Sequence, residues 1–168
     1  DLIVAPPAPR ADCDDALKAA GIKFRRASIP VHREGKSKMT CGAEQVVTYL
    51  RGPEGIAYNA PPTVTCTLAL ALARFETIAE AEALRLFQKR VVRIDHLGTY
   101  ACREMAAYPG WVSEHSYANA IDLEKLALSD GREISVQKYF EKTEAPPKRK
   151  EGEFLRVLSR RAYDAAPT

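Results

Sequence analysis

Hydrophobic side chains are most regularly spaced between residues 61 and 90, PPTVTCTLALALARFETIAEAEALRLFQKR. Prolines stand at the start of this segment and alanine and leucine fill it, as is typical of a helix. Its apolar members recur at spacings of three or four residues or of whole turns: Val64, Leu68, Leu72, Phe75, Ile78 and Leu86. The pattern predicts a long central helix whose apolar stripe belongs to the core and binds no ligand.

Shorter patterns predict the elements on either side of this helix. Acidic residues in the first turn, alanines within and Gly21 at the end predict a helix over 11–21. An amphipathic pattern predicts a last helix over 152–166, which follows an exposed linker. Alternating apolar positions and turn residues predict strands over 22–31, 44–50 and 91–98, and two more around a turn at 129–131.

These elements indicate the fold class. A chain of 168 residues, 46% of them hydrophobic, is long enough to bury one core. We therefore expect an irregular N-terminal extension over 1–11 and a single domain over 12–168. The mixture of helices and strands predicts an α+β fold with a small antiparallel sheet, a long central helix and flanking helices.

Composition and hydrophobicity argue against nucleic-acid binding and against a membrane span. Lys and Arg total 25 against 22 Asp and Glu, and the basic residues are scattered along the chain. A net charge of +3 that is spread in this way does not predict nucleic-acid binding. No apolar run approaches the roughly 18 residues that a membrane span needs, so we expect no span in this chain.

Four cysteines occur, Cys13, Cys41, Cys66 and Cys102, without a C-x-x-C pair among them. An even number of widely spaced cysteines fits two disulfides in an oxidising compartment, and four free thiols in a cytosolic protein are the alternative. Three pairings are possible. Of these we expect Cys66 with Cys102 and Cys13 with Cys41, because Cys66 and Cys102 flank the predicted central helix and the strand after it.

Candidate metal chemistry is concentrated in WVSEHSYANAIDLEKL, residues 111–126. His115 and Asp122 carry an imidazole and a carboxylate, which are both zinc ligands. Side chains alternate along a strand with period two, so residues seven apart cannot share one regular face. A turn or bulge between them, within SYAN, would be needed, and small Ala120 would leave space for a metal. A surface histidine and an unrelated strand-end aspartate are the alternative.

The pattern SEHSYANAID resembles the zinc-site motif of the D-alanyl-D-alanine carboxypeptidase and dipeptidase group, whose fold class includes lysostaphin-type peptidases and the hedgehog domain. Together with CGAEQ, PPTVTCTLALALARF, VVRIDHLGTYACR and IDLEKLALSDGREISV, the chain resembles the bacterial extensin-like protein C-terminal domain family. The resemblance begins at about Cys13 and covers almost the whole chain. It implies a hedgehog- or D-Ala-D-Ala-peptidase-like fold and an extracytoplasmic location, whether periplasmic, secreted or at the cell surface of a bacterium.

The resemblance also implies roles for particular residues. His115 and Asp122 would be zinc ligands, and Ser113 would support the histidine loop. Arg103, in GTYACR, matches an arginine of the related peptidases that polarises the substrate carbonyl. A fixed guanidinium can stabilise negative charge that develops on a carbonyl oxygen. The alternative for Arg103 is a structural ion pair with Glu104 or Asp95.

The chain departs from this pattern in its third ligand. Those families take it from an H-x-H-type segment near the C-terminus, whereas no histidine follows His115 here. His96 is expected to be a hydrogen-bonded structural residue, and His32 to be solvated in a basic loop. We therefore expect the chain to lack its C-terminal ligand segment, either because it is cut short or because the site is incomplete, and to be inactive as it stands.

Two functions follow from the resemblance. The first is a zinc-dependent peptidase-like domain that hydrolyses amide bonds in bacterial cell-wall peptides. The second is a non-catalytic module that retains the fold and binds peptidoglycan or a protein. A cysteine nucleophile has little support, because no cysteine stands beside a candidate histidine base.

Overall fold

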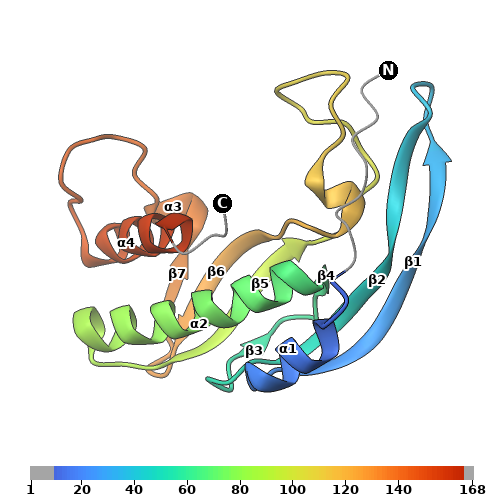
Figure 1. Cartoon of the computed structure of the whole chain (residues 1–168). Coiled ribbons are helices and arrows are strands. Elements are labelled where there is room, and N and C mark those ends of the chain that lie inside the picture. The colour runs from blue at the N-terminus through green and yellow to red at the C-terminus, as the bar shows by residue number, and fades with distance from the viewer. Residues whose placement is uncertain (1–9, 165–168) are drawn as a thin grey trace. The chain divides into compact units, whose positions relative to one another are not determined.

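A computed structural model describes residues 10–164 of the chain (Figure 1). The expected irregular extension over 1–11 lies almost entirely outside this range. The fold is α+β, and its residues form two compact units that interleave along the sequence. We call 10–50, 61–70 and 97–122 the disulfide unit, and 51–60, 71–96 and 123–164 the core unit. No helix among the described residues is long and apolar enough to cross a membrane.

The disulfide unit is built on a three-stranded sheet with the order β1-β2-β4. Its elements are α1 (Cys13–Ala19), β1 (Lys23–Glu34), β2 (Met39–Arg51, whose last residue lies in the core unit), β4 (Thr63–Thr65) and the 3-10 helix η1 (Glu114–Tyr117). Strands β1 and β2 form the long ribbon drawn in blue and cyan in Figure 1. Gly42 lets them approach, because a Cβ there would lie 2.4 Å from the carbonyl oxygen of Pro30.

The end of α1 follows the sequence rule for helix termination. Gly21 takes a left-handed conformation at φ +72°, which side chains other than glycine rarely adopt. The backbone N–H groups of Gly21 and Ile22 donate to the carbonyls of Lys18 and Leu17, both at 3.0 Å. The glycine predicted to end this helix therefore does so, and the chain continues directly into β1.

The core unit contains a second sheet, with the strand order β3-β5-β6-β7. Its elements are β3 (Ala57–Tyr58), most of α2 (Cys66–Phe87), most of β5 (Val91–Gly98), β6 (Asp122–Leu128) apart from its first residue, β7 (Glu133–Ser135), α3 (Val136–Tyr139) and α4 (Lys150–Asp164). Strand β6 pairs antiparallel with β7, and β3 pairs parallel with β5. Large buried side chains from α2, the sheet and α4 form its core, among them Leu86, Phe87, Ile94, Leu126, Leu128, Ile134, Phe154 and Leu158.

Three predicted boundaries were wrong. Residues 63–65 are strand β4 and not the start of the central helix, because Thr63, Val64 and Thr65 pair with β2 and their β-branched side chains favour a strand. Strand β2 is longer than the predicted 44–50. The second strand of the predicted hairpin ends at Ser135, whose side chain accepts a hydrogen bond from the Lys138 N–H and caps the short helix α3.

The expected disulfide pairing was also wrong. Cys13 is bonded to Cys66, and Cys41 is bonded to Cys102, with Cα–Cα distances of 5.8 and 5.6 Å. The prediction placed Cys66 and Cys102 together because both flank the central helix and the strand after it. In the structure Cys66 begins α2 and is joined to the first residue of α1, whereas Cys102 is joined to β2.

Candidate functional site

His115 is held in the short helix η1 of the disulfide unit. Ser113 is the N-cap of this helix, and its hydroxyl accepts a hydrogen bond from the His115 N–H at 3.3 Å. The helix ends at Ala118, which has the left-handed φ of +55°. This turn lies within the SYAN segment where the sequence required one, so Asp122 and His115 can face each other. The supporting role expected for Ser113 rests on this cap.

The ring of His115 is oriented by a backbone carbonyl. Its Nδ1 lies 3.1 Å from the carbonyl oxygen of Thr99, in a buried position. A carbonyl oxygen only accepts hydrogen bonds, so Nδ1 is the nitrogen that donates. In the neutral ring the other nitrogen, Nε2, then carries a free lone pair. This arrangement is common for histidines that bind metals, because the donated bond selects the tautomer and fixes the ring.

The free nitrogen of His115 faces a carboxylate. Asp122 is the first residue of β6, and its Oδ1 lies 3.3 Å from His115 Nε2. The side chain of Asp122 is 58% exposed, so the pair is open to solvent on one side. Two ligands of a tetrahedral zinc with bonds of roughly 2.0–2.1 Å are about 3.3 Å apart. The separation is therefore suited to a bound cation, and to a hydrogen bond only when the imidazole is protonated.

Ser116 connects this helix to the segment that carries Arg103. Its side chain is fully buried, and its Oγ lies 3.1 Å from the backbone nitrogen and 3.0 Å from the carbonyl oxygen of Arg103. The Arg103 carbonyl also accepts from the Ser113 N–H at 3.0 Å. These bonds fix the backbone of Arg103 beside η1. Neither Ser116 nor Thr99 was identified from the sequence, because a lone serine and a backbone carbonyl give no sequence signal.

The side chain of Arg103 is exposed and forms no ion pair with any described residue. The two acids that could have held it have other partners. Glu104 accepts hydrogen bonds from Ser37 and from the Gly110 N–H, whereas Asp95 pairs with Arg93 in the core unit. Within residues 10–164, the structural ion pair considered for Arg103 does not form, and its guanidinium is available to a ligand.

The two other histidines have structural explanations. His96 Nε2 lies 2.8 Å from the Ala60 carbonyl, and the His96 N–H donates to Asn59, which agrees with the expected structural role. His32 is exposed as expected, but it lies on β1 and not in a loop, because the strand extends to Glu34. The carbonyl of Pro30 and the carboxylate of Glu34 raise the pKa of His32.

One group of three potential metal donors exists among the described residues: His32, Glu34 and Cys102. Cys102 is bonded to Cys41, so its sulfur is not a free thiolate and this group is a poor metal site. His115 and Asp122 have no third histidine, cysteine, aspartate or glutamate close enough to complete such a group within residues 10–164. The pair therefore offers two protein donors.

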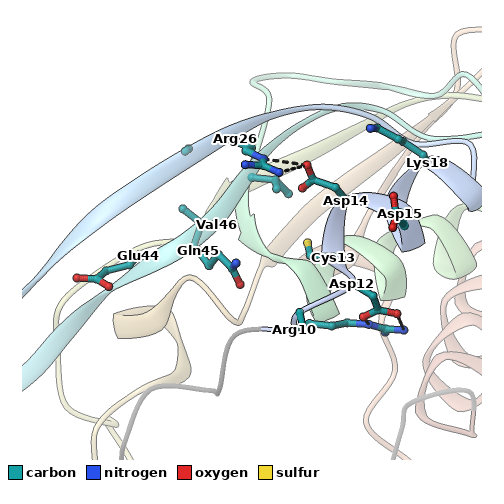
Figure 2. Close-up of a pocket in the computed structure, with 13 residues that line it drawn as sticks. Arg10, Asp12, Cys13, Asp14, Asp15, Lys18, Arg26, Glu44, Gln45 and Val46 are labelled. Carbon is teal, nitrogen blue, oxygen red and sulfur yellow. Dashed lines mark hydrogen bonds and ion pairs between the residues drawn. The ribbon is translucent and has the colours of Figure 1, made fainter.

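Two concave regions of the disulfide unit could hold a ligand. A shallow groove of about 580 Å³ is lined by Ile29, Pro30, His32, Glu34, Tyr100 and Cys102, directly before Arg103. A deeper pocket of about 560 Å³ lies between α1 and the β1-β2 ribbon (Figure 2). Figure 2 shows the Arg26–Asp14 ion pair across this pocket. Because Arg26 pairs with Asp14 and Arg10 with Asp12 on its walls, the deeper pocket is less suited to a ligand than the groove at Cys102, the residue before Arg103.

The structure defines a disulfide-bridged α+β protein in which a buried histidine faces an exposed carboxylate. Its sequence matches the model of the family described as extensin-like protein C-terminus over residues 11–165, and the chain belongs to this family. No curated protein and no solved structure matches the chain.

Proposed function

We propose that this chain is a zinc-binding, peptidase-like domain that acts on bacterial cell-wall peptides outside the cytoplasm. The observation that supports it most is the His115–Asp122 pair, whose Nε2 and Oδ1 atoms are 3.3 Å apart with the imidazole fixed by Thr99. The two disulfides are consistent with an extracellular protein. The proposed relation to the hedgehog and D-Ala-D-Ala peptidase fold rests on the sequence motif around this pair.

The residues of the site have distinct proposed roles. His115 Nε2 and Asp122 would hold zinc, which supplies a Lewis acid and an activated water when it is bound. The carbonyl of Thr99 keeps the His115 ring in the binding tautomer, and Ser113 keeps the helix in place. The guanidinium of Arg103 would bind the carbonyl oxygen of the scissile amide, where negative charge develops.

A non-catalytic binding module is the second candidate. It is favoured by the donor count, because catalytic zinc sites typically have three protein ligands and two are present among the described residues. In that case a cation held by the same pair, together with Arg103, would bind the carboxylates or carbonyls of a wall peptide without cleaving it. The two candidates share a ligand and differ in chemistry.

Zinc content tests whether His115 and Asp122 bind a metal or only stabilise the fold. The wild-type chain, His115→Ala and Asp122→Asn are dialysed against trace zinc, and the metal is measured by elemental analysis. We expect about one zinc per wild-type chain and a loss in both variants. His32→Ala is the matched control, because it removes an exposed histidine that also neighbours a carboxylate. A wild-type chain that retains no zinc would contradict the metal proposal.

Activity is tested separately. Zinc-loaded protein is incubated with purified wall peptides, and the products are analysed by mass spectrometry. Cleavage that disappears in Arg103→Lys and His115→Ala supports the peptidase. Retained zinc and peptide binding without cleavage supports the binding module, and would end the enzyme half of the proposal.

A further inference from the structure

Large apolar side chains are exposed along one short segment of the disulfide unit. Between residues 97 and 111 these are Leu97, Tyr100, Met105, Tyr108 and Trp111. Tyr108 is 62% exposed, and Trp111, the single tryptophan of the chain, is 49% exposed. Several exposed aromatic and apolar side chains in one place mark an interaction surface more often than chance exposure does. We call residues 104–112 the aromatic loop; Figure 1 draws it in yellow where it projects from the disulfide unit.

The aromatic loop has a defined conformation. The Met105 N–H donates to the Trp111 carbonyl at 2.7 Å, and the Trp111 N–H donates to the Tyr108 carbonyl at 3.1 Å. The carboxylate of Glu104 accepts from the Gly110 N–H at 3.0 Å and from the Ser37 hydroxyl at 2.8 Å. The backbone that carries both rings is thus ordered before a ligand arrives, which lowers the entropy cost of binding.

The loop is continuous with the candidate metal site. Arg103 precedes it, and Ser113, the cap of the helix that carries His115, follows it. The Ser113 N–H donates to the Arg103 carbonyl and closes the base of the loop. The buried hydroxyl of Ser116 bonds to the backbone of Arg103 and fastens this base to the helix. A ligand bound to the loop would therefore contact residues only a few positions from His115 in the sequence.

The charges around the loop select for an anion. Lys36 and Lys38 are exposed on either side of Ser37, which is bonded to Glu104, and Arg103 is exposed at the base. None of these three cations forms an ion pair with a described residue. The charge of Glu104 is already engaged, since the Gly110 N–H and the Ser37 hydroxyl lower its pKa. The surface thus combines open aromatic faces with unpaired positive charge.

We propose that the aromatic loop binds the sugar ring of a carboxylate-bearing wall glycopeptide and holds the attached peptide at the metal pair. Tyr108 and Trp111 would pack on the apolar face of the sugar ring, and the cations would bind the carboxylates of the glycopeptide. A lipid surface fits less well, because the residues next to the two rings are Ala106, Ala107, Pro109 and Gly110, which would bury little apolar area. This inference rests on the proposed function, since its ligand belongs to the same wall polymer.

The emission of Trp111 tests the proposal, because no other tryptophan contributes. The probes are a disaccharide-pentapeptide fragment of peptidoglycan and the same pentapeptide without sugar. We expect the fragment to shift Trp111 emission and to bind at least tenfold more tightly than the free pentapeptide. Tyr108→Ala should weaken binding of the fragment by roughly tenfold, whereas Tyr108→Phe, which keeps the ring, should bind it as the wild type does.

Tyr163→Ala is the control, because it removes a ring that is 83% exposed on α4 in the core unit, and it should not affect binding. Equal affinity for fragment and free pentapeptide would overturn the proposal. So would equal effects of Tyr108→Ala and Tyr163→Ala, or no response to the fragment. A blue shift with phosphatidylglycerol vesicles and none with the fragment would replace the glycopeptide with a membrane surface.

The variant His115→Ala separates the test of sugar binding by the loop from the test of zinc binding by the His115–Asp122 pair. That variant should lose zinc and still bind the fragment through its sugar. A wild-type chain that binds the fragment but retains no zinc would end the metal proposal and support this one. Zinc retention without fragment binding would do the reverse.

Discussion

Both units of this protein bury large apolar side chains, and the disulfide unit is also cross-linked. The core unit contains a broad cluster of large buried side chains, in which the rings of Phe87 and Phe154 meet edge to face at 5.7 Å. The disulfide unit also buries large side chains, among them Leu17, Tyr49, Val64 and Tyr117. Both disulfides lie in this second unit. Cross-links add to the stability that the burial of apolar side chains gives such a unit.

The unit that carries both disulfides also carries the candidate site. The candidate site residues His115, Asp122, Arg103 and Ser113 all lie in the disulfide unit. Covalent bonds restrict the unfolded chain whatever the surface residues are, so the disulfides stabilise this unit while it exposes aromatic and charged side chains. We infer that the disulfides stabilise the unit that carries the binding surface, and five predictions test this contrast.

The largest effect is expected from reducing both disulfides. The loops closed by Cys13–Cys66 and Cys41–Cys102 span 53 and 61 residues. Loops of this length stabilise by roughly 4 kcal/mol each in the chain-entropy model. Hydrogen exchange after reduction should therefore show loss of protection first in β1, β2 and η1, while α4 and β6 stay protected. Simultaneous loss of protection in both units would break the comparison.

Truncation of a central side chain in the core unit should show the opposite result, with hydrogen-exchange protection lost first in the core unit. Phe154 is completely buried in the core unit, and Phe154→Ala should cost roughly 3–5 kcal/mol through lost burial and the cavity it leaves. The measurement is the free energy of unfolding in urea, with hydrogen exchange to locate the loss. Tyr163→Ala, on the same helix but exposed, is the control and should change stability little. A small effect of Phe154→Ala would mean that the core unit does not depend on its apolar cluster.

A smaller effect is expected at the buried Tyr58–Glu76 contact of the core unit. The Tyr58 hydroxyl interacts with the carboxylate of Glu76, which is completely buried. Tyr58→Phe removes this donor and should cost about 1–3 kcal/mol, because a buried acceptor loses its partner. Tyr58→Phe and the wild type are compared by urea unfolding at pH 8. Equal stability would show that the contact contributes nothing.

The same contact predicts a pH dependence. Burial, and then the charge of Glu76, raise the pKa of Tyr58 above its ordinary value of 10.0. The unfolded chain releases this proton near pH 10 while the folded chain keeps it, so stability should decrease as the pH rises above about 10. Tyr58→Phe should lack this part of the decrease. An identical alkaline profile in both proteins would contradict the assignment.

The smallest effect is expected at the base of the aromatic loop. The Gly110 N–H, and then the Ser37 hydroxyl, lower the pKa of Glu104. A lowered pKa means that its contribution is present above the ordinary glutamate range and disappears as the pH falls through the lower folded value. Glu104→Gln should speed hydrogen exchange at Gly110 without changing the unfolding midpoint. Glu44→Gln, an exposed acid on β2, is the control; equal exchange at Gly110 in both variants would show that the Glu104 charge does not order the loop.

Much of the secondary structure could be predicted because its signals are local. Gly21 ends α1, Gly98 ends β5, and a turn near Gly131 joins β6 to β7, as expected from residue type and spacing. The predicted helix start at residues 61–65 failed because pairing with β2, which is distant in sequence, outweighs the proline signal. The family was identified from motifs spread along the chain and is confirmed over residues 11–165.

The candidate site likewise has features that the sequence predicts and features that only the folded chain decides. The sequence by itself determined which side chains can carry chemistry, because His115, Asp122 and Arg103 are recognisable by type and order. Only the tertiary structure decided that the Thr99 carbonyl orients His115, that Ser116 fastens Arg103 to η1, and that Cys41 joins Cys102. Hydrophobic periodicity and turn chemistry act between near neighbours and can be read along the chain. Disulfide pairing and hydrogen bonds to backbone carbonyls depend on which distant segments the folded chain brings together.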